Sequence, residues 1–257
     1  MTKNPDGADA ALERARKLIR PADLQNADPQ AQNYIDLIGP EDAPQPTASQ
    51  RAMINTIVAA IYERLWRPVG VAAFGLYGLS AQKEREEAAE RLRLRGNQQV
   101  LDVACGPGNF TNFFGSQLSG DGIAVGFDIS RPMIAQAVRD NRSSHAAYVR
   151  GDARRLPFDD ATFDAVCCYA ALYLVPDPFV VVDEMLRVLA PGGRIAIMTS
   201  YGSEIAPIHA ALSLGAKTIG VRIFDRSTFP AIFTAAGLVD IKQQTRGTAQ
   251  YVSAHRL

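Results

Sequence analysis

Little in the 257-residue chain suggests a disulfide-stabilised, metal-dependent or membrane-spanning protein. Its three cysteines, Cys105, Cys167 and Cys168, form neither a disulfide framework nor a metal-ligand spacing, and we expect them in the core. No apolar run reaches the ~20 residues that cross a bilayer. The polar first ten residues lack the apolar centre of a signal peptide. We therefore expect a cytoplasmic protein with no metal and no integral membrane association.

A surplus of positive charge is also absent. Lys+Arg and Asp+Glu both number 27, so the formal net charge is zero. Proteins that bind nucleic acids usually carry extra basic residues to offset the phosphates. The charge balance therefore argues against nucleic acid as a partner and favours a small molecule.

The pattern of apolar residues changes near residue 96. Before it, helices are predicted at 8–20, 49–67 and 81–95, separated by Pro- and Gly-rich stretches. After it, apolar strands alternate with helices, which is typical of a parallel sheet covered on both faces. We predict an N-terminal helical extension or cap over residues 1–95. Residues 96–257 should form a Rossmann-like, doubly wound α/β domain with a mostly parallel seven-stranded sheet.

Residues 100–111 contain an apolar strand, a Gly-rich turn and the start of a helix. Gly106 and Gly108 allow close approach of a ligand to the backbone, and the helix start offers free N–H groups. The third glycine of a dinucleotide-binding loop is missing, because Thr111 stands there. Asp102 would repel a pyrophosphate but could hold an ammonium group, directly or through water. The charges favour S-adenosylmethionine (SAM), which has an ammonium and a sulfonium but no phosphate, over NAD.

This segment resembles motif I of the class I SAM-dependent methyltransferases, with Ala104 at the first glycine position. The resemblance runs from about residue 96 to the C-terminus and includes five segments in the family's order. It is nearest to the ubiquinone/menaquinone-biosynthesis type and related small-molecule methyltransferases. It implies SAM as the cofactor and does not fix whether oxygen, carbon or nitrogen is methylated.

The resemblance also implies roles for individual residues. Asp128 would accept the ribose hydroxyls and Ile129 would pack on the adenine. Asp152 would take the adenine amino group, while the N–H of Ala153 reaches the ring. Each acid alone could be a turn residue, but their joint order favours a cofactor site. The predicted cofactor residues are Asp102, Ala104, Gly106, Gly108, Asp128, Ile129, Asp152, Ala153 and Tyr169.

The acceptor side is less informative. Residues 169–173 should border the transferred methyl, and Tyr173 could orient an acceptor. His209, in a helix predicted after the fifth strand, could serve as a general base. Both residues also have a simple structural interpretation, as core tyrosine and as surface or packing histidine.

Apolar residues at 49–79 and 203–224 suggest two covers over a hydrophobic acceptor, such as a fatty acid, lipid, quinone or polyketide. The same stripes could instead pack on the sheet or form a homodimer. The predicted activity is methyl transfer to a hydroxyl, carboxyl or carbon of a small hydrophobic molecule. The alternatives are an NAD(P)-dependent oxidoreductase, for which no clear Tyr-x-x-x-Lys pair is present, and a non-catalytic SAM-binding protein.

Overall fold

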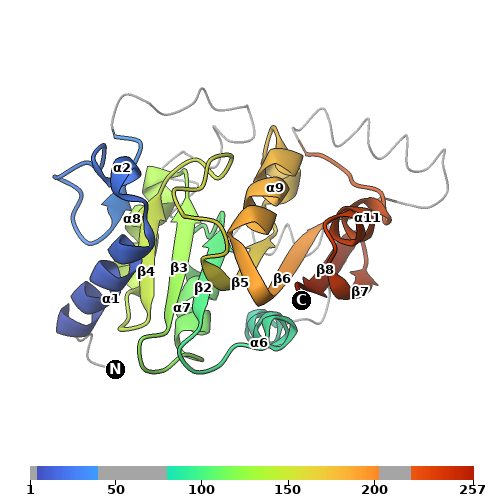
Figure 1. Ribbon diagram of the computed structural model, residues 1–257, viewed down its shortest axis with the longest axis horizontal. Coiled ribbons are helices and arrows are strands. Elements are labelled where there is room, and N and C mark those ends of the chain that lie inside the picture. The colour runs from blue at the N-terminus through green and yellow to red at the C-terminus, as the bar shows by residue number, and fades with distance from the viewer. Residues whose placement is uncertain (1–4, 40–79, 203–220) are drawn as a thin grey trace.

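An eight-stranded sheet forms the centre of the protein. The computed structural model describes residues 5–39, 80–202 and 221–257 (Figure 1). The strand order is β1-β4-β3-β2-β5-β6-β8-β7; β8 pairs antiparallel with β6 and with β7, and the other pairs are parallel. The strands are β1 (Ile35–Asp36), β2 (Gln99–Val103), β3 (Ile123–Asp128), β4 (Ala146–Arg150), β5 (Phe163–Tyr169), β6 (Leu189–Ser200), β7 (Val239–Arg246) and β8 (Ala249–His255). The seven predicted strands are all present, and the doubly wound fold is confirmed.

The eighth strand was not predicted. β1 pairs in parallel with the end of β4, Ile35 opposite Val149 and Asp36 opposite Arg150. A two-residue strand is too short to show the alternating pattern on which strand prediction depends. The N-terminal region therefore supplies an edge strand to the sheet.

Helices cover both faces of the sheet (Figure 1). They are α1 (Pro5–Leu18), α2 (Pro21–Leu24), α6 (Ala81–Leu92), α7 (Asn109–Gly115), α8 (Arg131–Asn141), α9 (Pro178–Val188) and α11 (Thr228–Ala235), with a short 3-10 helix, η2 (Leu172–Leu174). Buried side chains of α1, α9 and α11 join one core cluster, whereas those of α6, α7 and α8 pack in clusters with other sheet residues. The three cysteines are free and buried, as predicted.

Helix ends follow local capping. The Ser130 hydroxyl accepts a hydrogen bond from the Met133 N–H and caps α8, as expected from its position before Pro132. The helix predicted over 81–95 ends earlier, at Leu92. Arg93 adopts a left-handed conformation there and donates its N–H to the carbonyls of the preceding turn.

The predicted turn before the fifth strand lies inside β6. The partner of Phe163 is Leu189, but the partner of Ala165 is already Arg194. The residues between bulge out of the ladder, and Gly192 has a left-handed φ of +77°. The Pro-Gly-Gly sequence thus forms a bulge that interrupts one long strand.

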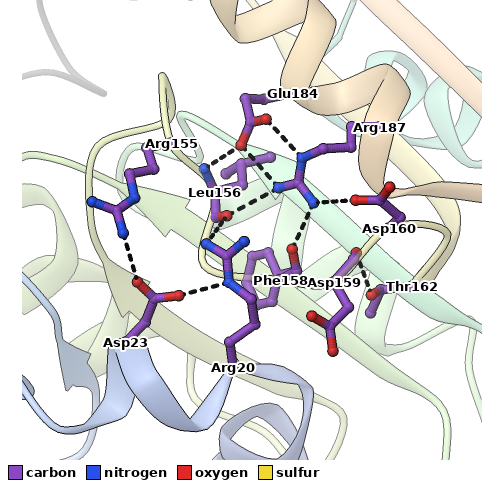
Figure 2. A network of polar contacts seen from close by, with 10 residues as sticks. All are labelled: Arg20, Asp23, Arg155, Leu156, Phe158, Asp159, Asp160, Thr162, Glu184 and Arg187. Carbon is purple, nitrogen blue, oxygen red and sulfur yellow. Dashed lines mark hydrogen bonds and ion pairs between the residues drawn. The ribbon is translucent and has the colours of Figure 1, made fainter.

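The N-terminal region contacts the sheet domain directly. Arg20 and Arg187 both donate to the Leu156 carbonyl, at 3.1 Å each, and Glu184 accepts the Leu156 N–H at 2.7 Å (Figure 2). Asp23 lies between Arg20 and Arg155. This network joins the N-terminal segment and α9 to the loop after β4.

Two predictions concern residues for which the structure gives no description. The apolar helix at 49–67 and the helix at 203–215 lie outside the described residues. The cap and the domain boundary at residues 95/96 therefore stay predictions. In the parts of the chain that are described, no helix combines the length and hydrophobicity needed to traverse a bilayer.

Candidate cofactor site

The candidate site lies where the strand order reverses. β3 and β4 follow one another to one side of β2, whereas β5 and β6 extend the sheet on the other side. In open α/β sheets, ligands bind outside the carboxyl ends of the strands at such a switch point. Asp102, Asp128 and Asp152 lie in or directly after β2, β3 and β4, so this edge is rich in carboxylates.

The Gly-rich loop faces open space at Gly106 and packs tightly at Gly108. Ala104, Gly106 and Gly108 all have left-handed φ angles, of +57°, +55° and +78°. A Cβ at Gly108 would lie 2.6 Å from the ring of Tyr148, whereas a Cβ at Gly106 would meet no atom within 4 Å. Glycine is thus required at 108 for packing, while the backbone at 106 faces open space that a ligand could use.

Asp128 is tied to this loop. The Gly106 N–H donates to its Oδ2 at 2.9 Å, and the Ser130 N–H donates to its Oδ1 at 2.8 Å. Burial raises the pKa of Asp128, although the N–H groups of Ser130 and Gly106 act in the opposite direction. A carboxylate has about four acceptor positions, so both oxygens can still accept ligand hydroxyls. The structure thus brings the loop and the β3 acid together.

Asp102 is buried beneath the loop, with 2% of its surface exposed. The Thr111 hydroxyl donates to it at 2.7 Å, and the Cys167 thiol lies 3.7 Å from its other oxygen. Burial raises the pKa of Asp102 to about 7, partly opposed by these hydrogen bonds and reinforced by the charge of Asp128. A nearby cation would favour its ionised form.

This titration predicts that SAM binding is linked to proton release. Below pH 7 the free protein holds a proton on Asp102. A bound ammonium lowers the pKa, so binding at pH 6 should release a fraction of a proton, and SAM affinity should rise towards pH 8. Calorimetry in two buffers of different ionisation enthalpy measures the release. Asp102→Asn should abolish it; an equal release from this variant would assign the proton to another group.

Asp152 already has a protein partner. The Arg154 guanidinium contacts both carboxylate oxygens at 2.7–3.1 Å and also reaches Asp177 at 3.1 Å. Burial alone would raise the pKa of Asp152, but hydrogen bonds from Arg154 outweigh it and lower the pKa. The acid therefore stays ionised at neutral pH. Ala153, beside it, is half-buried against the core.

Asp152→Ala should consequently weaken SAM binding only modestly. One hydrogen bond to the adenine would be lost. Because Arg154 already compensates the charge of Asp152, we expect the loss for a neutral pair, about 0.5–1.5 kcal/mol, or about 2- to 10-fold in Kd. Asp177→Ala is the matched control, because it removes the other acidic partner of Arg154 without touching a predicted cofactor residue. Wild-type affinity in Asp152→Ala would remove this residue from the site.

Tyr169, the last residue of β5, and Tyr173, in η2, lie in different surroundings. Tyr169 is buried and stacks on Phe110, with ring centroids 4.9 Å apart. Its hydroxyl has no hydrogen-bond partner in the described structure. Tyr173 is half-buried in η2, where its carbonyl accepts the Arg222 N–H at 2.8 Å. The ring of Tyr169 thus packs in the core, and a contact between Tyr169 and the cofactor stays a prediction.

His209 lies outside the described residues. The sequence did not indicate a role at the candidate site for Asp36, Arg150 or Arg154. Arg150 donates to the carbonyl of Ile129, the predicted adenine contact. Arg150 and Arg154 flank the segment Gly151-Asp152-Ala153, so their positions in the sequence could have indicated a contact with the acid between them. Asp36 gave no such indication, because nothing local marks a residue whose partner is 114 positions away.

Comparison with known proteins agrees with this geometry. The family model of the methyltransferase domain matches residues 101–197. This stretch contains the Gly-rich loop together with Asp102, Asp128 and Asp152, so the part of the chain that carries the predicted cofactor residues is similar to a methyltransferase domain.

One similar curated protein is the demethylmenaquinone methyltransferase of Geobacillus sp. (strain WCH70). It is 29% identical over 58% of this chain and 64% of the relative, so the match spans just under two thirds of that protein. Two solved structures share the fold. The SAM-dependent methyltransferase of Mesorhizobium loti has a TM-score of 0.56 at 22% identity, over 71% of this chain and all of the other. The cyclase SpnF has a TM-score of 0.63 at 19% identity, over 82% and 96%.

The polar groups at the candidate site fit SAM. The carboxylates of Asp102 and Asp128 lie beside a loop with open space at Gly106, which suits a cationic ligand with ribose hydroxyls better than a phosphate. Within residues 5–39, 80–202 and 221–257, no group of three or more His, Cys, Asp or Glu side chains could hold a metal ion.

Proposed function

We propose that the protein transfers a methyl group from SAM to a small hydrophobic acceptor, with a quinone-type ring as the first acceptor class to test. The observation that carries the proposal is the hydrogen bond from the Gly106 N–H to Asp128, which joins the Gly-rich loop to the predicted ribose acceptor at the switch point. The name of the curated relatives, demethylmenaquinone methyltransferase, supports a quinone.

The residues of the site would bind and orient rather than react. SAM supplies an activated methyl group on its sulfonium. Asp128 would accept the ribose hydroxyls, Ile129 would contact the adenine, and Asp102 would stabilise the ammonium through the loop. Correct alignment of acceptor and methyl can contribute ~7–11 kcal/mol to the barrier reduction. A general base is needed only for an acceptor that is not already ionised.

His209 and Tyr173 remain our proposals for the acceptor side. His209→Ala should lower turnover and leave SAM affinity unchanged, because a base acts on the acceptor proton and not on the cofactor. Single-turnover rates and calorimetry measure the two effects. An unchanged rate with every accepted substrate would leave His209 without a catalytic role.

Calorimetric titration with SAM, with NADH as the control ligand, tests the cofactor. Transfer of labelled methyl to a short-chain demethylmenaquinol, a fatty acid and a catechol then tests the acceptor. SAM binding with transfer to the quinol alone supports the proposal. NADH binding would favour the oxidoreductase, and SAM binding without any transfer would favour a non-catalytic role. The proposed cytoplasmic location and homodimer are tested separately, by fractionation and by light scattering.

A further inference from the structure

A buried ion pair lies at the edge of the sheet. Asp36, in β1, has a fully buried side chain, and the side chain of Arg150, at the end of β4, is 6% exposed. Nη1 of Arg150 donates to both carboxylate oxygens, at 2.9 and 3.0 Å. The N–H groups of Ile38 and Gly39 donate to the same carboxylate at 3.1 Å. A buried pair with this many hydrogen bonds is held in one geometry.

The same guanidinium reaches the predicted cofactor loop. Nε of Arg150 donates to the carbonyl of Ile129 at 3.1 Å. Arg131, two residues later, donates to Asp36 at 3.0 Å. Asp36 thus holds the loop that follows β3 at two points, one through Arg150 and one through Arg131. Asp128 lies at the start of this loop.

The N-terminal segment also holds the second predicted adenosine loop, the one after β4. The Arg20 N–H donates to the Pro157 carbonyl at 2.9 Å, and its side chain donates to Leu156 (Figure 2). Residues 19–39 therefore contact both loops that carry the predicted ribose and adenine contacts, Asp128–Ile129 and Asp152–Ala153.

We infer that Asp36 and Arg150 are positioning residues for the adenosine end of the cofactor site, and that the N-terminal segment completes this site. The inference rests on the proposed function, because it assumes SAM as the ligand. Asp36 orients the guanidinium, the guanidinium fixes the Ile129 carbonyl, and the loop then presents Asp128 and Ile129 together. Asp128 holds the Ser130 N–H of this loop by itself, and Arg150 adds the contact to the Ile129 carbonyl.

The test compares two ligands that share the adenosine half. S-adenosylhomocysteine carries the amino-acid group, and 5′-methylthioadenosine does not. In Asp36→Asn, we expect the Kd of both ligands to rise by the same factor, about tenfold, which is what one hydrogen bond to a charged group contributes. Asp102→Asn should affect only S-adenosylhomocysteine, because it acts on the ammonium.

Two further variants separate positioning from folding. Arg150→Lys keeps a positive charge beside Asp36, but its single side-chain nitrogen cannot also reach the Ile129 carbonyl. We expect this variant to bind both ligands more weakly than wild type and to lose less unfolding temperature than Asp36→Asn. Asp9→Ala removes the acceptor of the 2.7 Å hydrogen bond from Arg142 to α1, which involves neither loop, and should leave both Kd values unchanged. Hydrogen exchange without ligand should be faster at residues 128–131 in Arg150→Lys than in wild type.

The outcomes are distinct. Wild-type Kd values and wild-type exchange at residues 128–131 in Arg150→Lys would overturn the inference, even if Asp36→Asn fails to fold. If the wild-type protein binds S-adenosylhomocysteine but the variants lose affinity only for that ligand, the positioning role at adenosine is wrong and the proposed function stands. If the wild-type protein binds neither ligand, the proposed function fails and the inference fails with it.

Discussion

Asp128→Ala should weaken SAM binding by at least about 100-fold. The change removes the acceptor of the ribose hydroxyls, and hydrogen bonds to a charged group contribute about 1.5–3 kcal/mol each. It also removes the acceptor of the Gly106 N–H, so the Gly-rich loop loses its contact with β3. Calorimetric titration with SAM measures the effect directly.

Asp128→Asn is the control for loop geometry. Its amide oxygen can still accept one N–H, from Gly106 or from Ser130, so we expect an affinity between those of wild type and Asp128→Ala. The unfolding temperature of both variants identifies any general loss of structure. SAM affinity within twofold of wild type in a folded Asp128→Ala protein would show that the cofactor map is wrong.

Gly108→Ala should destabilise the fold by about 2–5 kcal/mol. A left-handed conformation costs alanine ~1–2 kcal/mol, and an overpacked core adds ~1–3 kcal/mol. The new methyl would lie 2.6 Å from the Tyr148 ring, which is fully buried and donates its hydroxyl to the Asn141 carbonyl at 2.9 Å. The ring cannot move without breaking this bond. Chemical denaturation measures the loss.

Gly106→Ala is the matched variant two residues earlier. Its φ is similarly left-handed, at +55°, but its methyl would meet no atom within 4 Å. The stability loss should therefore be limited to backbone strain, whereas SAM affinity should fall, because the methyl enters the space predicted for the ligand. Equal stability losses in the two variants, with SAM binding intact in Gly106→Ala, would contradict this description of the loop.

The sequence was informative where function is encoded locally. The loop at 104–108 and the acid Asp128 are recognisable because glycine and acidic residues occur at fixed distances from apolar strands. Alternation of strands and helices predicted the sheet, and a hydroxyl before a proline predicted the start of α8. Each of these features depends on residues within one turn or one strand of each other.

What the sequence did not reveal depends on contacts between distant segments. Arg150 resembles any strand-end arginine until Asp36 is placed beside it by the fold. Arg154 binds Asp152 two residues away, yet its link to Asp177 needs the β5–α9 connection. Arg93 ended α6 with a left-handed conformation that arginine rarely adopts, so no local preference marked it. The similarity to the cyclase SpnF concerns the fold alone and does not identify the reaction.

The short strand β1 has a consequence for solubility. The two borders of the sheet differ in character. The outer strand β7 exposes alternate residues that include Asp240 and Lys242, whereas all five residues of β4, the strand next to β1 at the other border, are buried. A charged outer strand discourages pairing with another molecule, but an apolar one with free N–H and C=O groups is a template for it. β1 pairs with the end of β4. It therefore blocks the pairing of another molecule with β4 there, at the border that lacks the exposed charged residues of β7.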